Sequence, residues 1–211
     1  MAEVEVKFAK LTLYGNLVVP KKAKGIVLFA YGAGSSRFSP RENFVARILN
    51  KKGFATLLMD LLTKEEEIDE QTREYRFDIP LLAERLVSAA KWLKENTSTK
   101  KLLLGLFGAS TGAAACLIAA ARLPEEIKAV VSRGGRPDLA RQFLSRVKAP
   151  TLLIVGGDDE PVIGMNKEAY KELPWEKKLE IVPGATHLFE EPGKLDEVAE
   201  LAAAWFEKWL K

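Results

Sequence analysis

Residues 103–112 read LLGLFGASTG and are the most informative segment of the sequence. It begins as an apolar run with the length of a buried strand, and the Ala-rich residues 111–122 that follow are typical of a buried helix. Between strand and helix stands G-x-S-x-G, a motif that places a serine on a sharp, strained turn. The small neighbours let helix and strand approach closely, and the turn exposes the hydroxyl beside free backbone N–H groups. We therefore predict that Ser110 is a nucleophile; the competing interpretation is a serine that only caps a helix.

Short apolar runs alternate with helical periods along the rest of the chain. The runs show little internal alternation, which is typical of parallel strands covered on both faces. This order predicts an α/β fold with a mostly parallel sheet, helices on both faces and a single domain over residues 1–211. Strands are expected at 3–10 and 11–19 (edge strands or a hairpin), 26–30, 55–59, 102–107, 129–131, 152–155 and 179–182, and helices at 41–50, 79–94, 111–122, 138–146, 166–173 and 195–210.

The charged segment 62–80 breaks this alternation. A solvated connection with a helical turn is one interpretation, because long loops commonly just cover the surface. The other is a flap that borders the active site. No larger lid is evident, so we expect small substrates with short acyl chains.

Composition excludes several classes of function. The 32 basic and 29 acidic residues give a net charge of +3, too small to indicate a nucleic acid or a membrane as partner. The longest apolar stretch, 113–121, is far shorter than the roughly 20 residues of a spanning helix. The first ten residues alternate like a strand rather than a signal peptide. We expect a soluble, cytoplasmic monomer or homodimer. Lys and Glu are abundant and glutamine is scarce, with two residues; this composition fits a heat-adapted or an engineered sequence.

Metal and cofactor chemistry is also not expected. One cysteine and one histidine leave almost no nitrogen or sulfur ligands for zinc, and a single cysteine excludes a disulfide framework. The sequence contains no phosphate-binding G-x-x-x-x-G-K-[ST] motif and no complete dinucleotide fingerprint. We therefore expect an enzyme without a cofactor.

The one histidine, His187, must carry any histidine chemistry. It lies in a loop between the last predicted strand and the last predicted helix, where a general base for the serine is expected. The competing interpretation is an incidental surface histidine.

The acid that orients this base should follow an intervening strand, because the chain order of this architecture is Ser, acid, His. The loop after the strand at 152–155 reads GGDDEPV and holds three adjacent acids, so the choice stays open. We favour Asp159, with Asp158 second and Glu160 third; the others would serve loop hydrogen bonds or a helix N-terminus.

Two backbone N–H groups should hold the oxyanion of a tetrahedral intermediate. The loop after the strand at 26–30 reads YGAGSSR, whose glycines permit a tight turn. We expect the amides of Thr111 and Ala33 to be the pair, with Gly34 as the rival to Ala33.

Three arginines are candidates for binding an anionic acyl or leaving group, because guanidinium matches carboxylate and phosphate. The stretch from Arg133 to Arg136 follows a predicted strand at the edge where ligands bind in open α/β sheets, and Arg37 follows the expected oxyanion loop. The alternative is that they form structural pairs with Asp138, Asp158 or Glu160. The three are Arg37, Arg133 and Arg136.

From about residue 17 to its end the chain resembles the small, dienelactone hydrolase-like group of α/β-hydrolases. The resemblance implies an α/β-hydrolase fold with a minimal lid and a serine hydrolase that cleaves small esters through a Ser-His-Asp triad and an acyl-enzyme. The G-x-x-D spacing supports Asp159 as the acid. The motifs that carry the resemblance are YGAGSSR (31–37), GASTG (108–112), VSRGGRPDL (131–139), GGDDEPV (156–162) and GATH (184–187).

The chain departs from this group in two places. Relatives commonly have His-Gly where Tyr31 and Gly32 stand, and that histidine usually supports the oxyanion loop. The enzyme that names the group uses a cysteine nucleophile, whereas the one cysteine here, Cys116, falls within the buried helix and is expected in the core. Lactone specificity is therefore not implied.

Two further alternatives concern the function as a whole. The departure at Tyr31 keeps open a catalytically weak or inert scaffold, either a pseudo-enzyme or an engineered variant, that binds a small ligand. Some members of the group carry phosphoribosyltransferase-type labels, but the sequence shows no acidic phosphoribosyl-binding loop.

Overall fold

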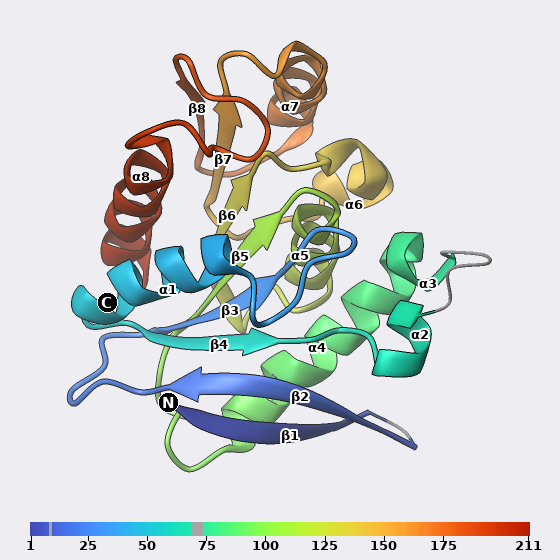
Figure 1. Ribbon diagram of the computed structural model, residues 1–211, viewed down its shortest axis with the longest axis vertical. Helices are drawn as coiled ribbons and strands as arrows, with labels where there is room; N and C mark the ends of the chain where they lie inside the picture. Colours follow the sequence, from blue (N-terminus) through green and yellow to red (C-terminus); the bar gives the residue numbers. More distant parts are fainter. Residues whose placement is uncertain (9, 69–73) are drawn as a thin grey trace.

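The computed structural model describes residues 1–8, 10–68 and 74–211. Its sheet has eight strands in the order β1-β2-β4-β3-β5-β6-β7-β8 (Figure 1). The pairs β1·β2 and β2·β4 are antiparallel and the others are parallel, which confirms the predicted mostly parallel α/β sheet. The strands are β1 (Ala2–Phe8), β2 (Leu11–Val18), β3 (Ile26–Ala30), β4 (Ala55–Met59), β5 (Leu104–Ala109), β6 (Ile127–Arg133), β7 (Thr151–Gly156) and β8 (Lys177–Val182); the helices are α1 (Pro40–Lys51), α2 (Lys64–Ile68), α3 (Glu74–Phe77), α4 (Ile79–Glu95), α5 (Thr111–Arg122), the 3-10 helix η1 (Pro137–Ala140), α6 (Arg141–Leu144), α7 (Glu160–Glu172) and α8 (Lys194–Trp209).

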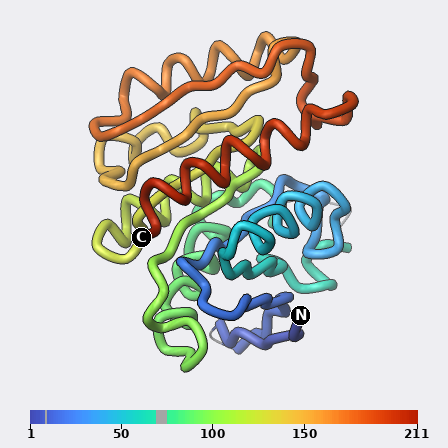
Figure 2. The backbone as a smooth tube through the Cα atoms, turned by 90° about the vertical axis from the view of Figure 1, so that its left-hand side faces the viewer, coloured from blue at the N-terminus to red at the C-terminus, as the bar shows by residue number. Residues whose placement is uncertain are grey.

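Helices cover both faces of the sheet, as the near-continuous apolar strands require. Helices α1 and α8 lie side by side on one face, and α4 and α5 pack against each other on the opposite face (Figures 1 and 2). Alternate residues of β3 serve the two sides: Val27 and Phe29 belong to the core beneath α1 and α8, while Ile26 and Leu28 belong to the core beneath α4 and α5. Helices therefore bury both faces of the sheet.

Helix α5 is the central element of one face. Ten of its residues, Thr111 to Ala120, are buried, because alanine side chains let α4 and the sheet approach closely. Cys116 is fully buried within it, and burial raises the pKa of its thiol far above the usual range. The prediction that this cysteine belongs to the core is confirmed.

Helix α7 begins six residues before the predicted start at residue 166. The acidic loop conceals the beginning of the helix, although Pro161 suits a first turn and Glu160 complements the helix dipole there. Gly164 weakens the helical pattern of the same turn. The earlier start places Asp159 at the N-cap of α7, at the end of the sheet.

The charged segment 62–80 contains α2, α3 and the start of α4. Residues 69–73 of this segment lie outside the described residues, and so does that part of the flap prediction. Arg85 of α4 is 2 % exposed and holds α2 through two hydrogen bonds to the Glu66 carboxylate, of 2.6 and 2.7 Å. It also donates to Leu61 O at 2.7 Å. The start of the segment is thus fastened to α4.

Glu66→Gln is expected to lower the free energy of unfolding near neutral pH by on the order of 1 kcal/mol, because Arg85 loses a charged acceptor. The hydrogen bond from Arg85 holds the pKa of the Glu66 carboxyl below its usual range. The stabilisation is therefore present above the pKa of the unfolded chain and is lost as pH falls through the lower pKa of the folded state. Urea unfolding should show that the difference in the free energy of unfolding between variant and wild type is smaller at about pH 3 than near neutral pH. Glu84→Gln, at an exposed position of α4, is the control. If Glu66→Gln lowered the free energy of unfolding equally at both pH values, the prediction would be contradicted.

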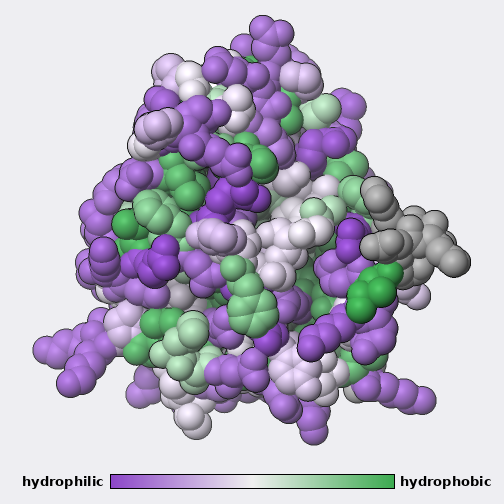
Figure 3. Space-filling model, viewed as in Figure 1, coloured by the Kyte–Doolittle hydropathy of each residue, from purple (hydrophilic) through white to green (hydrophobic). Residues whose placement is uncertain are grey.

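The surface in the view of Figure 1 is mainly hydrophilic, and its hydrophobic side chains form small separate groups (Figure 3). Phe38, Phe77 and Leu188 are among the large apolar residues exposed to solvent. Across the described ranges, with their gaps at residue 9 and residues 69–73, no helix has the length and apolar character needed to cross a membrane.

Candidate active site

Six parallel strands end at one edge of the sheet, and the predicted site residues follow five of them there. Ser110 follows β5, Arg133 ends β6, Asp159 follows β7 and His187 follows β8, while the loop of residues 31–39 follows β3 (the β3 loop). Carboxyl ends of parallel strands are where open α/β sheets bind ligands. The fold thus gathers segments that lie far apart in the sequence.

Ser110 lies on a strained turn between β5 and α5. Its φ is 50° and its ψ is −121°, a backbone conformation that costs free energy for any residue with a Cβ. Two hydrogen bonds from β6 and its loop hold the turn: Ser110 N donates to Arg133 O at 3.1 Å, and Arg136 N donates to Ser110 O at 3.0 Å. The serine is fixed at the edge of the sheet, as the motif predicts.

The two glycines of the motif are required by close packing. A Cβ on Gly108 would lie 2.5 Å from Ala113 Cα, and a Cβ on Gly112 would lie 2.4 Å from Ala30 O. Neither approach is possible for a residue with a side chain. The spacing of G-x-S-x-G therefore reflects how tightly α5 contacts β5 on one side and β3 on the other.

His187 and Asp159 are in direct contact. His187 Nδ1 lies 2.7 Å from Asp159 Oδ2, and the aspartate side chain is mostly buried. A carboxylate on Nδ1 favours the tautomer with its proton on Nδ1, which leaves Nε2 free as a base. Asp158 and Glu160 are exposed. Of the three candidate acids, the structure brings Asp159 to the histidine.

The loop that carries His187 is fastened from both sides. Thr186 donates to Glu191 Oε1 through its hydroxyl at 2.5 Å and its amide at 3.2 Å, and the hydroxyl contact lowers the pKa of Glu191. Arg41 of α1 donates to Glu190 Oε1 at 2.7 Å. The first contacts brace the loop internally, and the last ties it to α1.

Ser110 and His187 open into one cavity of about 310 Å³. The β3 loop lines it with Gly32, Ala33 and Ser35, and Phe77 and Leu188 supply apolar surface at its border. Phe77 belongs to α3, so part of the charged segment 62–80 does border the cavity. The space suits a small molecule.

The two residues expected to supply the oxyanion donors are in direct contact beside Ser110. Ala33 N donates to Thr111 Oγ1 at 3.1 Å, and both residues line the cavity with Ser110. Gly34, the rival donor, has a φ of 77° in the left-handed region. Tyr31, at the start of the β3 loop, is buried, and burial raises the pKa of its phenol well above the usual range.

Arg133 and Arg136 line the cavity, but each has an acidic partner. Arg133 forms a buried ion pair with Glu42 at 2.8 Å, their side chains being 6 % and 3 % exposed. Burial lowers the pKa of Arg133. Arg136 donates to both carboxylate oxygens of Asp138, at 2.9 and 2.8 Å, and this contact raises its pKa. The structural pairing expected as the alternative is thus present for Arg136.

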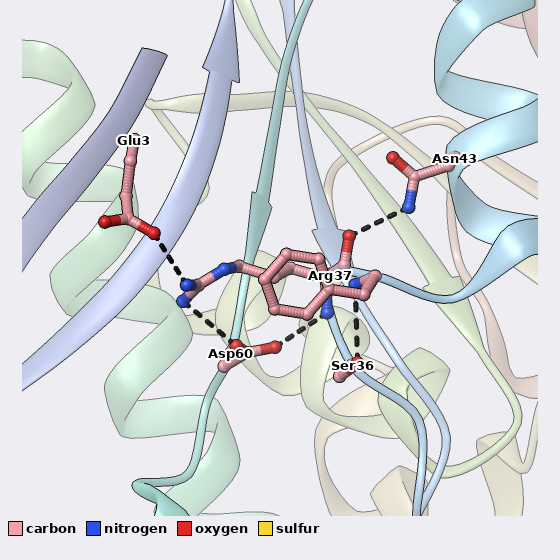
Figure 4. A network of polar contacts seen from close by, with 6 residues as sticks. Glu3, Ser36, Arg37, Asn43 and Asp60 are labelled. Atoms are coloured by element: carbon pink, nitrogen blue, oxygen red, sulfur yellow. Dashed lines mark hydrogen bonds and ion pairs between the residues drawn. The ribbon is translucent and has the colours of Figure 1, made fainter. Parts of the chain in front are cut away.

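Arg37 extends toward Glu3 of β1 and Asp60, the residue after β4 (Figure 4). It bridges Glu3 at 2.8 Å and Asp60 at 3.2 Å, and its own amide donates to Asp60 at 2.7 Å. Among the described residues that line the Ser110 cavity, Arg37 is not present. The prediction that placed it at the substrate site is corrected, because its guanidinium is paired with Glu3 of β1 and with Asp60 after β4.

Glu42 is a site residue that the sequence did not reveal. It accepts from Arg133 at 2.8 Å and from Ser39 Oγ at 2.6 Å, and it lines the Ser110 cavity. An acid in the first turn of α1 is what a helix dipole favours at the surface, so its position alone gave no sign of burial. The pairing with Arg133, 91 residues away, depends on the tertiary fold.

Comparisons with known proteins support the fold described above. The profile described as Dienelactone hydrolase family matches residues 13–211. A dienelactone hydrolase from Anabaena variabilis is 59 % identical, with a TM-score of 0.98 over 100 % of this chain and 98 % of that one. Est1E from Butyrivibrio proteoclasticus has a TM-score of 0.84 over 99 % and 98 % of the chains; at 16 % identity it shows the fold alone. A Mycobacterium tuberculosis protein, named as a proposed phosphoribosyl transferase, is 54 % identical over 204 residues, 97 % of this chain and 45 % of that protein. The chain thus spans less than half the length of this curated relative.

Proposed function

Because the chain belongs to the dienelactone hydrolase family and has the α/β-hydrolase fold of its relatives, we propose that it hydrolyses small carboxylic esters through Ser110, His187 and Asp159. The observation that carries this proposal is the 2.7 Å contact between His187 Nδ1 and Asp159, in a loop that shares a cavity with a serine on a strained turn. These residues come from three different strand ends, and an arrangement of this kind serves acyl transfer.

The reaction begins when Ser110 Oγ attacks the ester carbonyl and His187 Nε2 accepts its proton. Asp159 stabilises the imidazolium that forms. The resulting oxyanion lies between the β3 loop and α5, where we assign the amides of Thr111 and Ala33 as donors. The imidazolium then protonates the leaving alcohol. Water, activated by His187, releases the acid from Ser110 and restores the enzyme.

Small esters are the substrates that the cavity supports best. Its volume of about 310 Å³ lies at the lower end of small-molecule sites. Phe77 and Leu188 give it an apolar border that suits a short acyl chain or an alkyl leaving group. The guanidinium groups of Arg133 and Arg136 are engaged by Glu42 and Asp138, so we assign them no more than a secondary part in substrate binding.

The transferase name borne by the longer mycobacterial relative concerns a protein of which this chain matches 45 %. The present sequence shows no acidic phosphoribosyl-binding loop. We therefore propose ester hydrolysis rather than phosphoribosyl transfer for this chain.

Covalent labelling by a fluorophosphonate tests the proposal. An activated serine attacks the phosphorus and retains the phosphonyl group, so wild-type protein should gain one label, found on Ser110 by mass spectrometry. Ser110→Ala is the matched control and should gain none. A folded wild-type protein that resists the reagent would favour the inert scaffold, and a label on another residue would refute the assignment of the nucleophile.

A further inference from the structure

The hydroxyl group of Thr111 lies where the β3 loop and α5 meet, beside the nucleophile. Ala33 N donates to Thr111 Oγ1 at 3.1 Å. Thr111 is 6 % exposed and lines the Ser110 cavity. In the free protein, therefore, the Ala33 amide is already engaged by a neighbouring side chain.

Close packing confines this hydroxyl to the space beside Ser110. A Cβ on Gly32 would lie 2.9 Å from Ser110 Cβ, so the β3 loop passes directly over the nucleophile. On the other side of Thr111, Gly112 approaches Ala30 O just as closely. The Thr111 side chain thus connects α5 to the β3 loop beside Ser110, and we expect the oxygen of a carbonyl group bonded to Ser110 to lie next to it.

The hydroxyl has a hydrogen bond left to give. A threonine hydroxyl is one donor and has two lone pairs as acceptors. One lone pair accepts from Ala33, and within the described part of the chain this is its one hydrogen-bond partner. The O–H proton is thus available to an acceptor that enters the cavity.

We propose that the Thr111 hydroxyl donates to the oxyanion of the tetrahedral intermediate, beside the Thr111 amide, and that the Ala33 amide acts through this hydroxyl. The inference rests on the proposed function and refines the role of Ala33. Each hydrogen bond in such a chain polarises the next, so the donor strengthens as negative charge develops on the substrate oxygen. The hydroxyl keeps its proton, and no covalent bond changes at Thr111.

Two substitutions separate the hydroxyl from the shape of the side chain. Thr111→Val replaces the hydroxyl by a methyl group and should lower kcat for 4-nitrophenyl acetate on the order of a hundredfold, the scale of losing one oxyanion donor, with KM changed by less than about threefold. Thr111→Ser keeps the hydroxyl and should retain activity within about fivefold. Circular dichroism during thermal unfolding establishes that each variant is folded. Thr111→Ala, which lacks the hydroxyl without adding a methyl group, replaces Thr111→Val if that variant does not fold.

Each other outcome overturns the proposal. A Thr111→Val rate equal to wild type means that the hydroxyl has no part in the reaction, and a higher rate means that it blocks the Ala33 amide. Equal losses in Thr111→Val and Thr111→Ser point to packing. Wild-type turnover no faster than that of Ser110→Ala refutes the proposed function together with this inference, whereas Ser110-dependent turnover with an unchanged Thr111→Val rate refutes this inference alone.

Discussion

His187→Ala is expected to lower Ser110-dependent ester turnover by about 10⁴-fold or more, because the chain holds no second histidine that could accept the serine proton. Without the imidazole, no base accepts the proton of the Ser110 hydroxyl, and the serine is a poor nucleophile. Steady-state hydrolysis of 4-nitrophenyl acetate, with the Ser110→Ala rate subtracted, measures the effect.

The two neighbouring aspartates supply a matched control for this prediction. Asp159→Asn should lower kcat on the order of 10⁴-fold, because the amide favours the wrong imidazole tautomer. Asp158→Asn changes the same side chain at an exposed position and should leave kcat within about twofold. A His187→Ala variant that keeps a tenth of the wild-type rate, or equal losses in the two aspartate variants, would show that the reaction does not use this pair.

Arg133→Met is expected to destabilise the protein by about 3–5 kcal/mol, the largest effect on stability that the structure predicts. The substitution leaves the Glu42 carboxylate, 3 % exposed, without its cation. A buried charge that loses its partner bears most of its desolvation cost alone. Urea unfolding near neutral pH gives the change in the free energy of unfolding.

Removing both charges separates the ion pair from the packing around it. The double variant Glu42→Met/Arg133→Met should regain most of the lost stability, since an apolar pair of similar volume leaves no charge uncompensated. Arg136→Met breaks a partly exposed pair with Asp138 and should cost no more than about 1 kcal/mol. If Arg133→Met cost as little as Arg136→Met, the pair with Glu42 would not be electrostatically important in the folded protein.

The sequence predicted the centre of the sheet better than its loops. Strands β3 and β4 occupy the predicted residues 26–30 and 55–59, because each is a short, fully buried apolar run. The acidic loop after β7 concealed the first turn of α7, since its charges are equally typical of a loop and of a helix N-terminus. Hydrophobic periodicity does not locate the end of a helix where the terminal turn consists of polar residues.

For the site, motifs within one segment were informative and long-range charge pairing was not. The G-x-S-x-G pattern located the strained turn at Ser110, because its glycines report local packing. Arg37 was assigned to the substrate cavity from its place in the loop, yet its partners are Glu3 and Asp60. Which carboxylate an arginine meets depends on the order of the strands in the sheet.

The hydrogen bonds that β6 and its loop make to the turn at Ser110 have a consequence for when the proposed nucleophile reaches its conformation during folding. The motif is contiguous in the sequence, but the acceptor for the Ser110 amide belongs to Arg133 and one donor to its carbonyl belongs to Arg136, and both groups are in place only when β6 has paired with β5. A nascent chain that ends before β6 contains the whole motif but lacks these two hydrogen bonds. The conformation proposed to activate the serine thus depends on the pairing of β5 with β6, and not on the G-x-S-x-G peptide alone.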